Sequence, residues 1–301
     1  MDTPVGSSVL LLGVDGGGTK CRARLTDRAG TILGEGNAGP ANVRFGLTAA
    51  FTQILHATDQ CLEQAGASRT RQPIVACLAL AGIGDLTAAG EARSHPHPFA
   101  SMVCTSDAHA ACVGAHAGRD GGIVIVGTGS IGWANIAGQS HRVGGWGFPA
   151  SDEGSGAWLG NEAIRRVLLA GDGLLPWTDF LRAVFERFGN DPHAIVRWMS
   201  TARPRDYASI APSVVEQAAS GDRVATQLMQ AAAMHIDTLA TRLIELGAVR
   251  LSLMGGLATH IAPLLSRHTK DVLVPPLGDA LNGALRLAEF EAKRLSMKVP
   301  C

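Results

Sequence analysis

Residues 8–20 read SVLLLGVDGGGTK, a short apolar run that stops at Asp15 and is followed at once by three glycines. A run of this length without polar alternation predicts a strand that is buried on both faces. The glycines predict a tight turn, after which residues 21–25 alternate between apolar and polar, as a strand with one solvated face does. A second turn precedes another strand at 31–33, so the segment is predicted to form an antiparallel meander.

The same pattern returns in residues 122–130, GIVIVGTGS, where a second apolar run meets a second glycine-rich turn. Residues 131–136 and 141–143 then supply the second and third strands of a second meander. Chance similarity of two hairpins is the alternative, but the matched order of strands and turns favours a duplication. The sequence therefore predicts two related α/β domains that face each other across a cleft.

The segments after each meander alternate between strand and helix patterns, which is typical of α/β sheets covered by helices. Predicted helices cover residues 47–62, 108–116, 157–169, 224–246 and 280–295, and predicted strands cover 74–80, 101–105 and 249–254. This organisation predicts an N-terminal domain at 1–118 and a C-terminal domain at 119–284. The terminal segment 285–301 is expected to pack back on the N-terminal domain.

The composition is that of a globular protein without a dominant charge. Of 301 residues 46% are hydrophobic, and 26 Lys and Arg balance 26 Asp and Glu. A chain with no net charge offers no broad basic surface, so we expect neither a nucleic-acid nor a membrane partner. Six cysteines form no CxxC pair and no leader or spanning segment is visible, which predicts a cytoplasmic protein with small-molecule ligands. The oligomeric state stays open, a homodimer being one alternative.

Glycine-rich turns follow three of the predicted buried strands, at residues 16–18, 127–129 and 255–256. Glycine permits positive φ angles and lets backbone N–H groups approach phosphate oxygens, so three such turns favour a polyphosphate site. Simple tight turns are the alternative. Two common phosphate motifs are excluded by spacing, since Cys21 stands where GxGxxG needs its third glycine and Thr19-Lys20 reverses the order of the Walker residues.

These motifs resemble those of the actin-like and hexokinase-like ATPases, and more narrowly the BadF/BadG/BcrA/BcrD-type ATPase family. The resemblance extends over nearly the whole chain and implies duplicated actin-like (ribonuclease H-like) domains that flank a nucleotide cleft. The family likeness is carried by residues 13–20, 127–130 and 254–256. The likeness to its N-acetylglucosamine and glucosamine kinases is carried by Ala41-Asn42, residues 97–101, Ser106-Asp107-Ala108, Gly144-Gly145-Trp146-Gly147, residues 151–155 and residues 202–207.

The resemblance implies an ATP-dependent kinase that uses Mg²⁺ and converts glucosamine to glucosamine 6-phosphate. N-acetylglucosamine as the acceptor is the first alternative, because the sequence does not decide whether the amino group is free. A partner-driving ATPase of the same fold is the second, but such activases share an iron–sulfur cluster through cysteines, and residues 150–155 contain none. A sugar sensor without catalysis is the third, and the presence of Asp15 and Asp107 counts against it.

Asp107 is the predicted catalytic residue. It stands between a predicted strand and a predicted helix, and in the resembling kinases the matching Asp orients the sugar 6-hydroxyl and takes its proton. An ordinary helix cap is the alternative. Asp15 matches the position that in the family binds nucleotide-bound Mg²⁺, usually through water. Its alternative is a turn residue that bonds its own backbone.

The remaining site residues are implied by the resemblance. The ATP-binding set is Gly17, Gly18, Thr19, Lys20, Gly127, Thr128, Gly129, Ala218, Gly255 and Gly256. The sugar-binding set is Asn42, Asp107, Gly145, Trp146 and Asp152. Simpler roles are open for several of them: Lys20 facing solvent, Trp146 in a core, Ala218 in helix packing, and Asp152 or its neighbour Glu153 capping the next helix.

Overall fold

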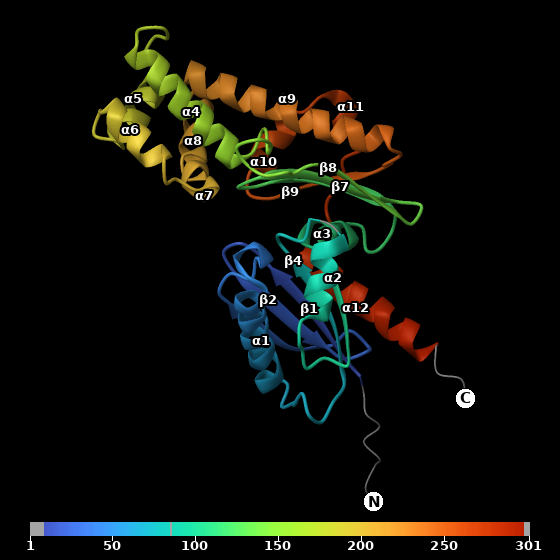
Figure 1. Cartoon of the computed structure of the whole chain (residues 1–301). Coiled ribbons are helices and arrows are strands. Elements are labelled where there is room, and N and C mark those ends of the chain that lie inside the picture. Colours follow the sequence, from blue (N-terminus) through green and yellow to red (C-terminus); the bar gives the residue numbers. More distant parts are fainter. Residues whose placement is uncertain (1–8, 85, 298–301) are drawn as a thin grey trace, which may run out of the picture. The chain divides into compact units, whose positions relative to one another are not determined.

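The computed structural model describes residues 9–84 and 86–297, and the chain divides into two compact units (Figure 1). Unit 1 runs to Asp120 and resumes at Pro276, and unit 2 is the continuous segment Gly121–Pro275. The return to unit 1 therefore precedes the last helix, whereas the predicted boundary at residue 285 falls inside it. Each unit contains one mixed β-sheet with helices, which confirms the α/β fold class.

The sheet of unit 1 has the strand order β3-β2-β1-β4-β5. Strands β1, β2 and β3 form the predicted antiparallel meander, and β4 and β5 lie parallel to β1. Alternate residues of β1 enter different cores, which explains why this strand is apolar throughout. The strands are β1 (Leu10–Gly16), β2 (Cys21–Thr26), β3 (Ile32–Ala38), β4 (Ile74–Leu80) and β5 (Ser101–Ser106).

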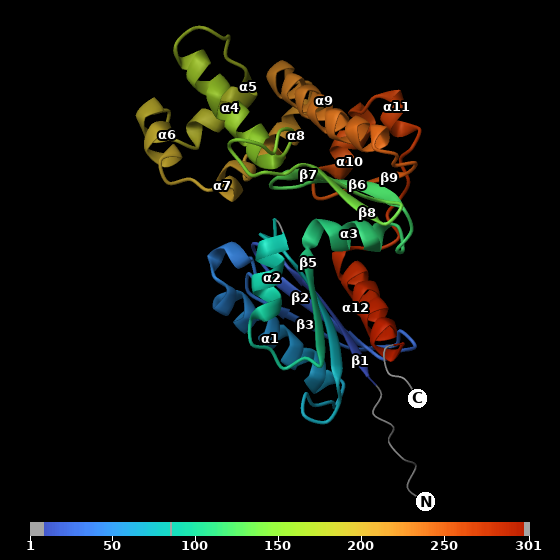
Figure 2. The same cartoon turned by 45° about the vertical axis from the view of Figure 1, so that its right-hand side comes forward.

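Helices cover both faces of this sheet (Figure 2). Helix α1 packs on β2 and β3, and its Gln60 and Gln64 bond the backbone of Asn37 and Glu35 on the edge strand β3. Helix α12 packs on the opposite face, against β1 and β4, and α3 lies beside it, in contact with α12, β4 and β5. The helices are η1 (Val43–Phe45), α1 (Leu47–Gln64), α2 (Leu86–Ser94), α3 (Asp107–Ala115) and α12 (Ala280–Ser296).

Helices α3 and α12 pack closely because each presents a glycine to the other. A Cβ atom on Gly283 would overlap the carbonyl oxygen of Ala110, and a Cβ atom on Gly114 would overlap that of Asp279. Both positions therefore exclude any larger side chain unless the helices move apart. The crossing fixes α12 against the helix that begins at Asp107.

The sheet of unit 2 has the order β8-β7-β6-β9, with a second antiparallel meander and β9 parallel to β6. The long helix α9 packs on this sheet, and a group of shorter helices adds a large apolar core. The strands are β6 (Gly121–Val126), β7 (Ser130–Ile136), β8 (Gln139–Gly144) and β9 (Leu251–Met254). The helices are α4 (Gly156–Gly171), α5 (Asp179–Glu186), α6 (Pro192–Met199), α7 (Pro204–Ala208), α8 (Ala211–Ala219), α9 (Arg223–Glu245), α10 (Ala258–Ile261), η2 (Ala262–Leu264) and α11 (Arg267–Lys270).

Within residues 9–84 and 86–297, none of the helices combines the length and the apolar character that crossing a membrane requires.

Candidate active site

The predicted site residues of unit 1 gather at one edge of its sheet. Strands β1, β4 and β5 are parallel, and their last residues Gly16, Leu80 and Ser106 are aligned in the ladder. Asp15 lies at the end of β1 and Asp107 directly follows β5. Because the carboxyl ends of parallel strands share one edge, both carboxylates belong to it, and this edge is where open α/β sheets place their ligands.

The first glycine-rich hairpin is anchored at the same edge. It is closed by the Gly17 N–H, which donates to the carbonyl oxygen of Lys20 at 2.9 Å. The N–H groups of Ala41 and Ala81 donate to the carbonyl oxygens of Gly17 and Gly16 at 3.0 and 2.8 Å. Gly18, Thr19 and Lys20 are exposed beyond this anchor. The hairpin therefore has a fixed base and a tip that is open to a ligand.

Asn42 lies beside this hairpin. Its Oδ1 accepts a hydrogen bond from the Arg44 N–H at 2.9 Å and so caps η1. The same oxygen is 2.5 Å from the point where a Cβ atom would stand on Gly82, just beyond the end of β4. The predicted sugar residue Asn42 thus shares the edge with Asp15 and Asp107, and its amide nitrogen is not used by the cap.

Asp107 is the first residue of α3 but does not cap it. The cap is Ser106, whose Oγ accepts from the His109 N–H at 3.1 Å. The Asp107 Oδ1 accepts from the Ala108 N–H at 2.9 Å, and the residue is half-buried. A negative side chain in the first turn interacts favourably with the helix dipole. The alternative of an ordinary cap is therefore wrong for Asp107, since the neighbouring serine already fills that position.

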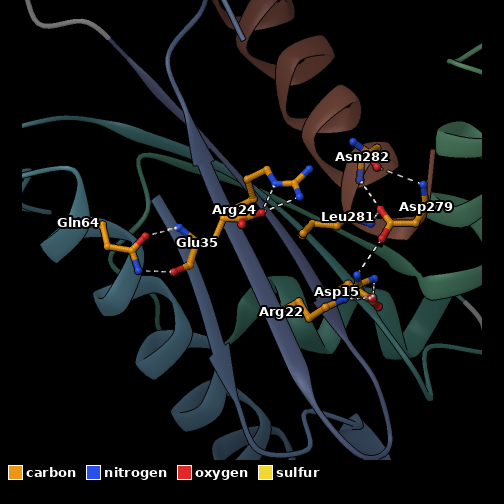
Figure 3. Close-up of polar contacts among 8 residues, drawn as sticks. All are labelled: Asp15, Arg22, Arg24, Glu35, Gln64, Asp279, Leu281 and Asn282. Atoms are coloured by element: carbon orange, nitrogen blue, oxygen red, sulfur yellow. Dashed lines mark hydrogen bonds and ion pairs between the residues drawn. The ribbon is translucent and has the colours of Figure 1, made fainter. Parts of the chain in front are cut away.

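Asp15 pairs with Arg22, a cation that no motif of the sequence indicates. Its Oδ2 accepts from Arg22 on β2, at 2.6 Å from Nη2 and 3.2 Å from Nε (Figure 3). Arg22 also pairs with Asp279, with 2.8 Å between Nη1 and Oδ2. Asp279 is far from Arg22 in the sequence, so no local pattern indicates this pair. Its cap position before α12 is the only signal that the sequence offers.

The second hairpin, between β6 and β7, is held by the next helix. The N–H groups of Gly156 and Ala157, at the start of α4, donate to the carbonyl oxygens of Gly127 and Thr128 at 2.8 and 3.0 Å. The Gly127 N–H donates to the Gly129 carbonyl oxygen at 2.9 Å, and Thr128 is exposed at the tip. The hairpin therefore repeats the arrangement of unit 1: a bonded base below an accessible threonine.

The third glycine-rich turn lies next to the second hairpin. Gly255 follows β9 with φ +98°, and a Cβ atom there would overlap the carbonyl oxygen of Val126, the last residue of β6. Only glycine accepts this close approach together with a positive φ. The structure therefore brings the predicted ATP residues Gly127 and Gly255 to one end of the unit 2 sheet, and Gly256 follows them.

Asp152 joins the second hairpin to the loop after β8. Its Oδ1 accepts from the Gly147 N–H at 3.2 Å, and its Oδ2 is 2.5 Å from where a Cβ atom would stand on Gly129. Burial raises the pKa of this carboxyl group, against the lowering effect of the backbone hydrogen bonds. Ser155 caps α4 by accepting from the Trp158 N–H. The capping alternative is therefore wrong for Asp152 and for Glu153.

The loop after β8 is shaped by an arginine. The Arg142 guanidinium donates to the carbonyl oxygen of Gly144 at 3.0 Å and to that of Gly145. It also lies over the Trp146 ring, 4.1 Å from the centroid. The Trp146 side chain is 70% exposed, so the alternative of a core residue is wrong. The loop presents an aromatic face held by a cation, which suits the apolar face of a sugar ring.

Ala218 lines a cavity of about 330 Å³ in unit 2. The cavity lies between α8, α9, α10 and η2, and α10 begins shortly after Gly255 and Gly256. Its wall is mostly apolar, with a few polar groups, as binding sites for flat organic rings tend to be. Ala218 was indicated by the family resemblance, but no motif indicates the polar groups of the wall, which are Thr226, Gln230, Thr259 and His260.

Comparison with solved structures defines the class of protein. A Chromobacterium violaceum protein described as a candidate N-acetylglucosamine kinase superposes with a TM-score of 0.86 and 34% identity, over 94% of this chain and 99% of the other. A ROK-family glucokinase from Streptomyces griseus, solved with glucose and AMPPNP, gives a TM-score of 0.56 at 18% identity, over 93% and 99%. The fold is therefore that of actin-like sugar kinases, as predicted.

Sequence comparison then identifies the family. Residues 12–279 match the BadF/BadG/BcrA/BcrD ATPase family, and the chain belongs to it. Glucosamine kinase GspK of Vibrio cholerae is 41% identical over 278 residues, which are 92% of this chain and 95% of the relative. The N-acetylmuramic acid/N-acetylglucosamine kinase of Clostridium acetobutylicum is 26% identical over 96% of this chain and 91% of its own. The family resemblance of the sequence is thus confirmed.

Proposed function

We propose that the protein transfers the γ-phosphoryl group of ATP to the 6-hydroxyl group of glucosamine. The observation that carries the proposal is the placement of Asp107, in the first turn of α3, at the sheet edge that also bears the Gly16–Lys20 hairpin and Asn42. A base for the acceptor hydroxyl and a phosphate-binding hairpin are the two parts that this reaction requires. The relative named as a glucosamine kinase supports glucosamine as the acceptor.

In this proposal the nucleotide is bound by groups of both units. Exposed backbone and threonine groups at the two hairpin tips would donate to the phosphate oxygens, as glycine-rich loops do in other phosphate sites. The cavity lined by Ala218 would take the adenine ring, because it is largely apolar and has a few polar groups for the ring nitrogens. Lys20 is exposed and within the first hairpin, where its charge would favour a polyphosphate.

Asp15 is the group that fits a magnesium ion. The described parts of the chain hold no cluster of three or more His, Cys, Asp or Glu that could bind a metal ion by themselves. A single, partly exposed carboxylate suits an ion that keeps most of its waters and has phosphate ligands. Mg²⁺ bound with the nucleotide would offset the negative charge of the β- and γ-phosphates.

The sugar would be held by Asn42, Asp152 and the loop that carries Gly145 and Trp146. Asp107 would accept a hydrogen bond from the 6-hydroxyl group and orient its oxygen toward the γ-phosphorus. As the new oxygen–phosphorus bond forms and the bond to the β–γ bridging oxygen breaks, the hydroxyl proton passes to the Asp107 carboxylate. The products are glucosamine 6-phosphate and ADP, and the proton then leaves to water.

The test is ADP release measured with glucosamine, with N-acetylglucosamine and with neither. We expect fast release with glucosamine and only a slow background without sugar. Faster release with N-acetylglucosamine at equal concentration would move the assignment to that acceptor, which the Chromobacterium violaceum structure favours. Equal release with and without either sugar would contradict a sugar kinase.

A further inference from the structure

Arg22 lies between two carboxylates that come from segments far apart in the sequence. One edge of its guanidinium donates to Asp15 on β1, and Nη1 pairs with Asp279, the residue before α12 (Figure 3). The Arg22 side chain is 30% exposed. The three groups together carry one net negative charge, and without Arg22 they would carry two.

Both partners of Arg22 are held in place by other bonds. The Asp279 Oδ1 accepts from the N–H groups of Leu281 and Asn282, each at 3.1 Å, and the Asn282 side chain accepts from the Asp279 N–H at 3.1 Å. This capping box leaves Oδ2 of Asp279 for Arg22. Asp279 therefore has two separate tasks, one oxygen capping α12 and the other fixing the guanidinium.

Neighbouring groups favour the charged forms of Arg22 and Asp279. Partial burial acts to lower the pKa of Arg22, but the hydrogen bonds and charges of Asp15 and Asp279 outweigh it and raise the pKa. Burial likewise acts to raise the pKa of Asp279, but the Asn282 N–H and the charge of Arg22 outweigh it and lower the pKa.

We propose that Arg22, fixed by Asp279, is a positioning residue that neutralises Asp15 in the nucleotide-free protein, so that Asp15 accepts Mg²⁺ only when the ion arrives on the nucleotide. The proposal rests on the proposed function, in which Asp15 faces the metal of Mg·ATP. The physical reason is that a guanidinium 2.6 Å from the carboxylate repels a bare divalent cation. The same positive charge reduces the repulsion between Asp15 and the approaching phosphates.

The variant that removes the charge is Arg22→Met, and the chain offers a matched control. Arg24 lies on the same strand and the same sheet face, but its Nε donates to Glu35 at 2.6 Å instead (Figure 3). Arg24→Met therefore removes a guanidinium of equal size and charge without uncovering Asp15. Arg22→Lys restores the charge with a different donor geometry.

The experiment is calorimetric titration of the wild-type protein and its variants with Mg²⁺ alone, with ADP in EDTA and with Mg·ADP. For Arg22→Met we expect binding of Mg²⁺ alone to tighten about tenfold and binding of metal-free ADP to weaken about tenfold, since one unit charge is removed at contact distance. Arg24→Met should stay close to the wild type in both titrations, and Arg22→Lys should lie nearer to the wild type than Arg22→Met. Thermal unfolding of each variant shows that the protein is folded.

The Asp15→Asn variant separates this inference from the function on which it rests. If Mg²⁺ tightens ADP binding to the wild type and Asp15→Asn removes that effect, while Arg22→Met behaves like Arg24→Met, the role of Arg22 is refuted and the metal assignment stands. If Asp15→Asn keeps the full effect of Mg²⁺, Asp15 does not face the metal, and both the assignment and the inference are refuted.

Discussion

Asp107 is the side chain on which the proposed chemistry depends. We expect Asp107→Asn to lower kcat by about 10²–10⁴-fold, the range of a positioned general base, with a much smaller change in the sugar KM. A purely structural Asp at the start of a helix is available as a control, since Asp179 opens α5 after the cap Thr178 as Asp107 opens α3 after Ser106. Asp179→Asn should leave kcat unchanged. A folded Asp107→Asn protein with normal turnover would leave Asp107 with only a helix-dipole role.

Replacing Asp152 and Asp222 by Asn should change the unfolding temperature at neutral pH in opposite directions. Burial raises the pKa of Asp152, so its ionisation costs stability, and Asp152→Asn should raise the unfolding temperature at neutral pH and lose that gain as the medium becomes acidic. For Asp222, the cap of α9, backbone N–H groups outweigh burial and lower the pKa. Asp222→Asn should therefore lower the unfolding temperature at neutral pH and have no effect below the pKa of the folded state.

Thermal unfolding followed between about pH 3 and 7 measures both effects. Asn tolerates the φ of +72° at position 152, so the variant changes charge rather than backbone. In Asp152→Asn the sugar KM should rise by about 10- to 100-fold, the contribution of a hydrogen bond to a charged group. A pH-independent difference between the wild type and Asp152→Asn would contradict a raised pKa.

Site residues that belong to a local motif could be predicted from the sequence. Residues whose partners lie far away in the sequence could not. Asp15 and Asp107 follow strand patterns that are visible locally, and the structure places both at one sheet edge. The Arg22–Asp279 pair and the polar wall of the cavity near Ala218 arise only when distant helices pack. No periodicity in one segment contains that information.

The glycines at which α3 and α12 cross, Gly114 and Gly283, should tolerate no larger residue. A Cβ atom on Gly283 overlaps the Ala110 carbonyl oxygen, so Gly283→Ala should destabilise the protein by about 1–3 kcal/mol, as overpacking does. Gly90 lies inside α2 with nothing near its missing Cβ atom, and Gly90→Ala should be neutral or stabilise by up to about 1 kcal/mol. Urea unfolding of both variants measures these changes in the free energy of unfolding. Equal stabilities would mean that the helices can separate freely.

The regular elements near the hairpins are those that the sequence predicts well. Strand β1 was expected at residues 9–14 and lies at Leu10–Gly16, and α9 was expected at 224–246 and lies at Arg223–Glu245. The region from α5 to α8 was not predicted. Its helices have five to nine residues, and three of them begin at or next to a proline. Helices this short show too few turns for an apolar period to emerge.

Nucleotide binding should change hydrogen exchange in both units, because the proposed ATP residues belong to both. A non-hydrolysable ATP analogue with Mg²⁺ should slow hydrogen exchange in the Gly16–Lys20 hairpin and in the Gly127–Ser130 hairpin. Each unit has an internal control in a turn outside the proposed site, at residues 27–30 and at 137–138. Protection of one hairpin alone, at saturating ligand, would contradict binding by both.

Unit 1 consists of two separate segments of the chain, and this affects when each unit can fold during synthesis. Unit 2 is one continuous segment and can fold as soon as it has emerged from the ribosome. Unit 1 cannot, because Ala284, Ala288 and Ala292 of α12 complete the core over β1 and β4. Strands β1 and β4 therefore keep one apolar face uncovered until α12, which follows unit 2 in the sequence, has been translated. An apolar face left uncovered in an incomplete chain is the kind of surface that favours aggregation.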